Sequence, residues 1–379
     1  MGIKNIICSS LLIGGAMMCG GINAQESGKL TLFVGTALPA TENGITVYEF
    51  DPNDASVTKK SEVTGIANPT YLAVGLEGET LYAVSENEGS NAALYAYSFN
   101  PETFNLSLIN SQPTKGSAPC YVCVSPDSLF VATANYNGRN ISLLPLKKSK
   151  GVHEASIIKY IGGTPESERQ SEPHLHSVYP SPDFKYLLAN DLGTDNIYIY
   201  KYDEAKEGKI KIGMHPYRTI KMDAGEGPRH TAFHPNRKYA YVIGELSGNV
   251  TVFKYDNGNL TKIQSLNADD EHASGSADIH LSPDGKFLYV SNRLKGDGIA
   301  IFKVFPSSGR IERVGYQYTG IHPRNFTITP NGKYLLCACR DSNIVEIYER
   351  DKETGLLKKT DKSIAVDKPM CVKFLQSYE

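Results

Sequence analysis

The sequence predicts an all-β protein, a seven-bladed β-propeller, on three observations. Six complete units and the first strand of a seventh recur along the chain, with their starts 46 to 55 residues apart. Each complete unit has two apolar strands, a third strand that ends near an aromatic residue, and a looser fourth strand. The turns SPDG, HPNR and TPNG carry Pro early and Asp or Asn later, which suits a tight reversal. Four strands repeated at a period of about 40 to 50 residues are typical of a propeller.

The units follow one another along the chain. They begin at Pro69, Pro119, Pro173, Pro228, Ala277, Pro323 and Pro369. The last unit has only its innermost strand, and two unpaired strands are expected at 30–36 and 44–50. We therefore expect the N-terminal strands to complete the C-terminal blade and to close the ring, which removes exposed sheet edges. Residues 25–379 then form a single domain.

The first 24 residues have a different pattern. Lys4 precedes an apolar stretch from Ile6 to Met18, and a small residue, Ala24, stands at the expected cleavage point. This is the layout of a secretory signal peptide over residues 1–24, and the stretch is too short for a membrane span. We expect export, to the periplasm. Lipid anchoring through Cys19 is the less favoured alternative, because Ala-Met-Met before it is a poor lipidation motif.

Composition excludes several classes of function. The formal net charge is -2, so no basic field is present to attract nucleic acid. Seven Cys occur, and the CxxC of Cys120 and Cys123 has no second pair at zinc spacing. We interpret these two residues, and Cys337 with Cys339, as core residues of strands.

The hairpin geometry predicts where polar side chains gather. A strand advances about 3.3 Å per residue, so the start of an innermost strand and the end of the second strand return to one rim. Arg229 and Glu245 occupy these two places in one unit. Innermost strands begin near His176, Arg229, Asp278 and Arg324, and second strands end near Glu86, Asn135, Asp191, Glu245, Arg293 and Arg340. We expect a charged rim at one mouth of the channel, although solvated ion pairs between blades would give the same pattern.

Other chemistries have little support. The pair His174 and His176 could begin a metal site, but no third ligand is identifiable and nearby Arg would repel a cation. No phosphate-binding loop, nucleotide fingerprint or nucleophile elbow is present, so no cofactor is expected. His234 and His280 are interpreted as packing or turn residues.

The segments PHLHSVYPSPD, GEGPRHTAFHPN, YVIGEL, SADIHLSPDGKFLYVSNR and HPRNFTITPNGKYLL resemble the seven-bladed lactonase family. That family includes the propeller type of 6-phosphogluconolactonase and the fungal carboxymuconate cyclase. The resemblance covers nearly all of residues 30–375 and is strongest from 173 to 349. It implies His176, Arg229, Glu245 and Arg293 as active-site residues, and these are rim positions that the hairpin geometry also selects. The expected signal peptide is a departure from the family, because a pentose-phosphate enzyme needs a cytosolic substrate. It argues against a phosphorylated substrate more than against lactone chemistry.

The resulting hypothesis is metal-independent hydrolysis of a sugar lactone at the channel mouth. Arg229 and Arg293 would hold the substrate's anionic group and the developing oxyanion, and either His176 or Glu245 would activate water. Further substrate contacts are expected from Asp278, Arg324 and His230. The expected partner is a small anionic lactone, with the protein a monomer or weak oligomer. A cyclase or lyase acting on an unsaturated dicarboxylic acid, and a non-catalytic exported propeller that binds carbohydrate or protein, are the alternatives.

Overall fold

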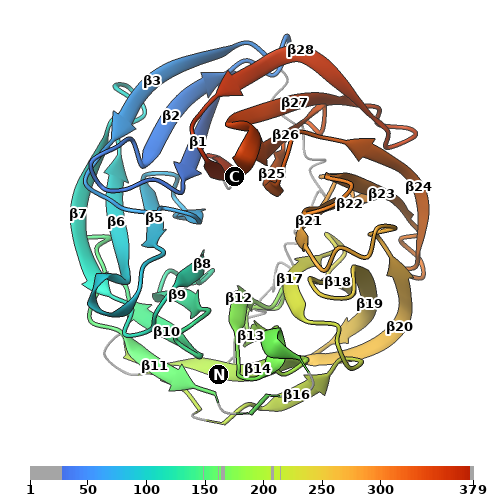
Figure 1. The fold of residues 1–379 in the computed structure, drawn as a ribbon. Helices are drawn as coiled ribbons and strands as arrows, with labels where there is room; N and C mark the ends of the chain where they lie inside the picture. Colours follow the sequence, from blue (N-terminus) through green and yellow to red (C-terminus); the bar gives the residue numbers. More distant parts are fainter. Residues whose placement is uncertain are drawn as a thin grey trace, which may run out of the picture.

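The computed structural model describes residues 28–147, 149–160, 162–163, 167–205, 209–213 and 215–375. The expected signal peptide, residues 1–24, lies outside this part of the chain. The described strands form seven sheets arranged in a ring, so the predicted seven-bladed propeller is confirmed (Figure 1). Among the described residues, no helix combines the length and hydrophobicity that a transmembrane span requires.

Blades 1 to 3 follow the predicted order from the channel outwards. Blade 1 consists of β4 (Leu72–Val74), β5 (Thr80–Ser85), β6 (Ala93–Phe99) and β7 (Leu106–Pro113). Blade 2 consists of β8 (Pro119–Val124), β9 (Phe130–Asn135), β10 (Asn140–Pro145) and β11 (Ser156–Lys159). Blade 3 consists of β12 (Leu175–Pro180), β13 (Tyr186–Asp191), β14 (Asn196–Ala205), β15 (Lys209–Ile212) and β16 (Arg218–Lys221). Its outer edge is divided, because β15 and β16 pair with different parts of β14.

Blades 4 to 6 are regular four-stranded sheets. Blade 4 consists of β17 (Pro228–Phe233), β18 (Tyr239–Gly244), β19 (Asn249–Asp256) and β20 (Asn259–Asn267). Blade 5 consists of β21 (Ser276–Leu281), β22 (Phe287–Asn292), β23 (Gly298–Val304) and β24 (Ile311–Tyr318). Blade 6 consists of β25 (Pro323–Ile328), β26 (Tyr334–Cys339), β27 (Ile344–Arg350) and β28 (Leu357–Ala365). Short 3-10 helices η1 (Gly89–Asn91), η2 (Glu168–Gln170) and η4 (Arg340–Ser342) lie in the connections.

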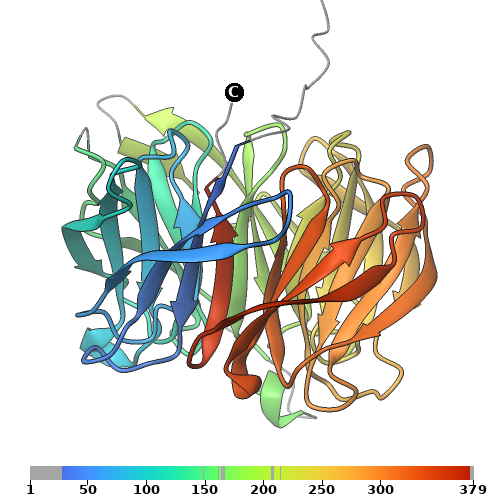
Figure 2. The ribbon, with the colours of Figure 1, turned by 90° about the horizontal axis from the view of Figure 1, so that it is seen from above.

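Blade 7 closes the ring with both ends of the chain. The innermost strand β29 (Pro369–Phe374) pairs with β1 (Leu30–Thr36), which continues through β2 (Ile45–Phe50) to β3 (Val57–Val63). The predicted closure is therefore confirmed. Figure 2 shows β1 and β29 side by side.

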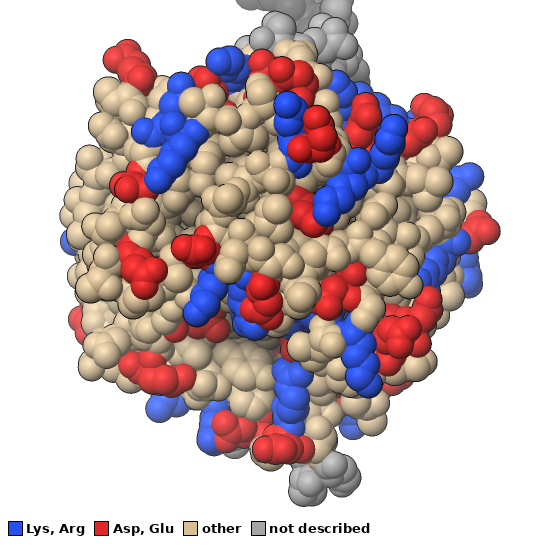
Figure 3. Space-filling view, turned by 45° about the horizontal axis from the view of Figure 1, so that its top comes forward, with Lys and Arg blue, Asp and Glu red and all other residues tan. Residues whose placement is uncertain are grey.

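The core lies between the blades. The second strand of every blade is buried on both faces, as in Tyr239–Gly244 and Phe287–Asn292, because each sheet packs against a neighbour on either side. This packing explains why the sequence lacks clean alternation of apolar and polar residues in these strands. On the face of the molecule shown in Figure 3, acidic and basic side chains are interspersed over the surface.

Candidate active site

A β-bulge near the start of several innermost strands places the candidate residues. The pairing register shifts around the second residue of β8, β12, β17 and β25, and the residues at these shifts are Cys120, His176, Arg229 and Arg324. A bulged residue is left out of the ladder, and its side chain is re-aimed. In three of these strands the preceding residue is Pro, which has no N–H to contribute to the ladder. In these three strands the proline thus favours exclusion of the next residue from the ladder, whereas His176 follows Leu175.

Glu245 is the centre of a group of side chains that we call the rim cluster. Its members are Glu245, Arg169, Arg229, Arg293 and His176. Glu245 directly follows β18, and its carboxylate forms ion pairs with Arg229, with Arg169 at 2.7 Å and with Arg293 at 3.2 Å. The Nε2 atom of His176 lies 3.8 Å from the same carboxylate. The four residues named for catalysis from the sequence are therefore brought together around one carboxylate.

The four residues named for catalysis from the sequence are almost closed to solvent. His176, Glu245 and Arg293 are each 4% exposed and Arg229 is 2% exposed. Burial alone would raise the pKa of Glu245, but the attraction of Arg229 and Arg293 outweighs burial and holds its pKa well below the usual range. Burial, reinforced by the charge of Arg229, lowers the pKa of His176 well below its ordinary value. At neutral pH the carboxylate is ionised and the imidazole is neutral.

Arg324 adds a further positive charge beside the rim cluster, near Arg229. Its Nη2 atom lies 3.9 Å from the carboxylate of Glu86, which accepts a hydrogen bond from Thr70. Within the described part of the chain, the guanidinium groups at this site outnumber the carboxylates with which they pair by two. The members are Arg169, Arg229, Arg293 and Arg324 against Glu86 and Glu245. A cluster with this excess is suited to bind an anion.

Asp278 and His230 form a second cluster beside the rim. The Nδ1 atom of His230 lies 2.8 Å from one carboxylate oxygen of Asp278, and Nε2 of His280 lies 2.9 Å from the other. Asn325 also donates to this carboxylate, and Asp278 is only 1% exposed. The carboxylate of Asp278 is therefore shared by groups of neighbouring blades rather than paired with the arginines of the rim cluster. His280 contributes to this network as well as to packing.

Aromatic rings pack around His230 in the channel. Its ring lies 5.2 Å from that of Tyr121, 5.8 Å from that of Tyr71 and 5.4 Å from that of His176. Tyr71 and Tyr121 also line a cavity of about 280 Å³ that includes Lys373 and Phe374, at the far ends of the inner strands. His230 thus packs against His176 of the rim cluster and against two residues that line this cavity.

Several predicted rim residues serve the local structure instead. The carboxylate of Asp191 accepts hydrogen bonds from the backbone of His174 and Gly193 and from the hydroxyl of Thr194. Asn135 is fully buried and donates to Asn140 and Ser142 of its own blade. Arg340 pairs with Asp341 in the following turn. The rim that strand ends alone predict is therefore larger than the cluster that forms.

The expected pairing of His174 with His176 on one strand face is not observed. β12 begins at Leu175, so His174 precedes the strand, and its ring stacks on that of Tyr136 at 4.2 Å. Among the described residues, no group of three or more His, Cys, Asp or Glu is arranged to hold a metal ion. Metal independence stays a prediction.

Three residues of the site had not been identified from the sequence as site residues. Arg169 and Tyr136 contact each other at 3.3 Å, and the thiol of Cys120 lies 3.8 Å from Nδ1 of His176. Arg169 and Tyr136 lie in connections, where the repeat gives no positional signal. Cys120 could have been found, because it holds the same place after Pro as Arg229 and Arg324.

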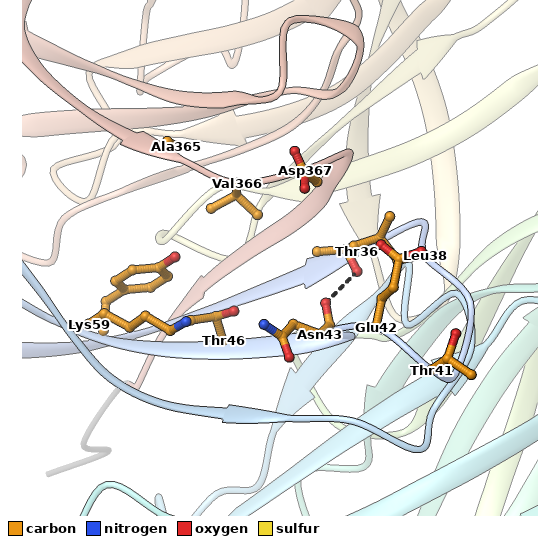
Figure 4. A pocket seen from close by; sticks show the side chains of 11 residues that line it. Thr36, Leu38, Thr41, Glu42, Asn43, Thr46, Lys59, Ala365, Val366 and Asp367 are labelled. Atoms are coloured by element: carbon orange, nitrogen blue, oxygen red, sulfur yellow. Dashed lines mark hydrogen bonds between the residues drawn. The ribbon is translucent and has the colours of Figure 1, made fainter.

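A separate cavity of about 410 Å³ lies at the seam of the ring, between the β1–β2 connection and the end of β28 (Figure 4). Its lining includes Thr36, Asn43 and Asp367, and Thr36 donates a hydrogen bond to the backbone of Asn43 at 3.2 Å. None of the residues of the rim cluster lines it. This cavity is therefore separate from the rim cluster.

Comparisons with known proteins identify the family of this fold. Residues 31–374 match the family model described as Lactonase, 7-bladed beta-propeller. A 6-phosphogluconolactonase from Bacillus subtilis (strain 168) is 35% identical over 354 residues, which is 90% of this chain and 97% of that protein. A crystal structure from Bacteroides fragilis NCTC 9343, described as a candidate 6-phosphogluconolactonase, has 44% identity and a TM-score of 0.89, over 93% of this chain and 99% of that one. A periplasmic gluconolactonase from Pseudomonas aeruginosa has 30% identity and a TM-score of 0.85, over 92% and 100% of the two chains.

Proposed function

The chain belongs to the seven-bladed β-propeller lactonase family, and we propose that it hydrolyses a sugar lactone at the rim cluster without a metal ion. The observation that carries the location is the burial of His176, Arg229 and Arg293 around the single carboxylate of Glu245. Names of relatives at 34–35% identity support a lactone, and they support its sugar character.

The arginines supply the electrostatic part of the reaction. Attack on a lactone carbonyl places negative charge on its oxygen, and donors fixed in a water-poor site stabilise that charge. Arg293 is held by donation from Nε to the backbone oxygen of Gly275 at 2.8 Å. The Nε atom of Arg229 is buried and finds no hydrogen-bond partner among the described residues. We assign this free N–H of Arg229 to the oxyanion.

His176 is the better of the two candidate bases. Glu245 forms ion pairs with three guanidinium groups and accepts hydrogen bonds from two of them, Arg169 and Arg229, so its carboxylate oxygens are already occupied. His176 is neutral, so its imidazole can take a proton from water as the water oxygen attacks the carbonyl carbon. The imidazolium then returns the proton to the ring oxygen as the C–O bond breaks, which yields a hydroxy acid. The negative charge of Glu245 balances the positive charges of the arginines during these steps.

We also propose that the protein is exported to the periplasm. The support is the signal-like pattern of residues 1–24, together with a solved relative described as a periplasmic gluconolactonase. An exported enzyme would meet sugar lactones outside the cytosol, so the neutral and phosphorylated substrates must both be tested.

The test is hydrolysis followed by acid release. Purified protein is assayed near pH 6.5 on glucono-1,5-lactone and on its 6-phosphate, with and without a chelator, after subtraction of the spontaneous rate. Turnover of either lactone that is insensitive to the chelator is expected. No turnover on any lactone would contradict the proposed hydrolase, and loss of turnover with chelator would contradict metal independence.

A further inference from the structure

Arg169 differs from the other arginines of the rim cluster in its exposure. It lies on η2, in the connection between blades 2 and 3, and its side chain is 42% exposed, against 3% for Arg229 and 5% for Arg293. It reaches Glu245 across 76 positions of sequence. Arg169 is therefore the member of the cluster that faces arriving molecules.

The backbone that carries Arg169 is anchored. The next residue, Gln170, is 3% exposed, and its amide donates to the backbone oxygen of Leu192 at 2.9 Å and to Asp195 at 2.8 Å. The hydroxyl of Ser171 donates to the backbone oxygen of Glu168 at 3.0 Å. A change in the position of the Arg169 guanidinium thus needs only side-chain rotation.

The guanidinium of Arg169 donates hydrogen bonds to three groups at the rim cluster. Its Nη2 donates to Glu245 at 2.7 Å and to the Tyr136 hydroxyl at 3.3 Å, and its Nη1 donates to the backbone oxygen of Ser274 at 3.4 Å. When these contacts break, Glu245 keeps its pairs with Arg229 and Arg293. Because the Arg169 side chain is 42% exposed, its guanidinium can be hydrated when it leaves, whereas a released Arg229 or Arg293 would stay buried without its partner. Release of Arg169 therefore costs less than release of a buried arginine.

We propose that Arg169 determines substrate specificity by leaving Glu245 to bind a phosphate or carboxylate group that the lactone carries outside its ring. This proposal rests on the proposed lactonase activity. The planar guanidinium makes two-pronged contacts with either anion. The excess of positive charge at this mouth means that an anionic substrate is attracted before the ion pair of Arg169 and Glu245 breaks.

The experiment compares Arg169→Ala with wild type on three lactones: neutral glucono-1,5-lactone, its 6-phosphate, and the carboxylate-bearing glucaro-1,4-lactone. The expected result is that kcat/KM for the preferred anionic lactone, divided by kcat/KM for the neutral one, falls about 10- to 100-fold, chiefly through KM. The two anionic lactones distinguish phosphate from carboxylate. Arg169→Lys should lie between, because it keeps the charge and loses the fork.

Arg139→Ala is the matched control. Arg139 is also a half-exposed arginine, 51% for its side chain, and it pairs with Glu172 rather than Glu245. Loss of the Arg139 side chain should leave the ratio of kcat/KM for the anionic lactone to kcat/KM for the neutral lactone within threefold of wild type. An unchanged ratio in Arg169→Ala, or an equal fall for neutral and anionic lactones, would overturn the proposal.

A readout independent of turnover separates this proposal from the lactonase itself. Calorimetric titration with 6-phosphogluconate and with glucarate, the open-chain anions, should show binding that Arg169→Ala weakens about 10-fold or more. If wild type hydrolyses no lactone, the proposed function fails, and this titration still decides the role of Arg169. Equal binding of both anions by wild type and variant would then exclude it.

Discussion

The guanidinium of Arg229 and the carboxylate of Glu245 form a buried ion pair, although 16 positions separate them. Arg229 is the second residue of β17, and Glu245 directly follows β18, so the antiparallel hairpin returns one to the other. Pro228 pairs with Gly244 at the same end of the hairpin. The site is thus fixed by strand register, and changes to its charges should affect both stability and catalysis.

The first prediction concerns Glu245→Gln. Loss of the carboxylate leaves Arg229 and Arg293 buried with uncompensated charge, so we expect the free energy of unfolding to fall by about 3–5 kcal/mol. Urea unfolding at pH 7 measures this change. Glu154→Gln, at an exposed carboxylate that pairs with Lys115, is the control and should stay within about 0.5 kcal/mol of wild type. A change of similar size in both variants would contradict the role given to Glu245.

His176→Ala tests the assignment of the base. If His176 takes the proton from water, kcat should fall about 100-fold or more while KM changes less. Steady-state lactone hydrolysis gives both constants, and circular dichroism shows whether the fold is kept. His153→Ala, at an exposed histidine, should match wild type. A His176→Ala enzyme with wild-type kcat would return the role of base to another group.

The pH dependence of activity follows from the lowered pKa of His176. Burial and the charge of Arg229 disfavour the imidazolium, and a general base works only when neutral. As pH falls, the imidazole should therefore stay active below its ordinary pKa of about 6.5. We expect kcat/KM to be level from pH 8 to below pH 6.5. An acid limb centred at or above 6.5 would show a histidine in contact with solvent.

Much of the fold was predictable because it depends on a period. Strand boundaries follow the repeated Pro, the turn residues and the apolar runs, and the closure of blade 7 follows from unpaired strands at both ends. The rim cluster was predictable where strand register alone places a residue, as for Arg229 and Glu245. Packing of one blade on another decided the rest. Asp278 is hydrogen-bonded to His230 and Asn325 of the adjacent blades, and Asp191 is hydrogen-bonded to the backbone of its own turn.

Arg169 shows the other limit of sequence reasoning. It lies in the connection between two blades, 76 positions from its carboxylate partner, and no repeat relates the two places. Its role depends on how a short 3-10 helix is anchored through Gln170. Such an anchor is visible only once the blades are assembled.

Stability should decrease as the pH is lowered from 7 towards 4. Burial lowers the pKa of His230 to about 4 and that of His322 to about 3, so the folded protein binds fewer protons than the unfolded chain below pH 6.5. Each such histidine should cost roughly 1.4 kcal/mol per pH unit once the pH is below 6.5. The loss continues until the pH falls through the folded pKa. Urea unfolding at half-unit steps measures the slope, which His230→Gln should reduce. An equal slope in the variant would mean that His230 is protonated in the folded state.

The last prediction concerns the closure of the ring. Phe33 of β1 is fully buried, and its ring meets that of Phe99 of β6 edge to face at 5.2 Å, so blade 7 packs on blade 1 through this pair. Phe33→Ala should lower the free energy of unfolding by about 3–5 kcal/mol, because a large ring is removed from a packed core. Leu108→Ala, at a side chain that is 55% exposed on the outer strand β7, is the control and should change it by less than about 0.5 kcal/mol. An effect of Phe33→Ala as small as that of Leu108→Ala would mean that the N-terminal strands are not required to hold the ring closed. A large effect of Phe33→Ala alone, with a single unfolding transition, would show that the N-terminal strands are part of the cooperative unit.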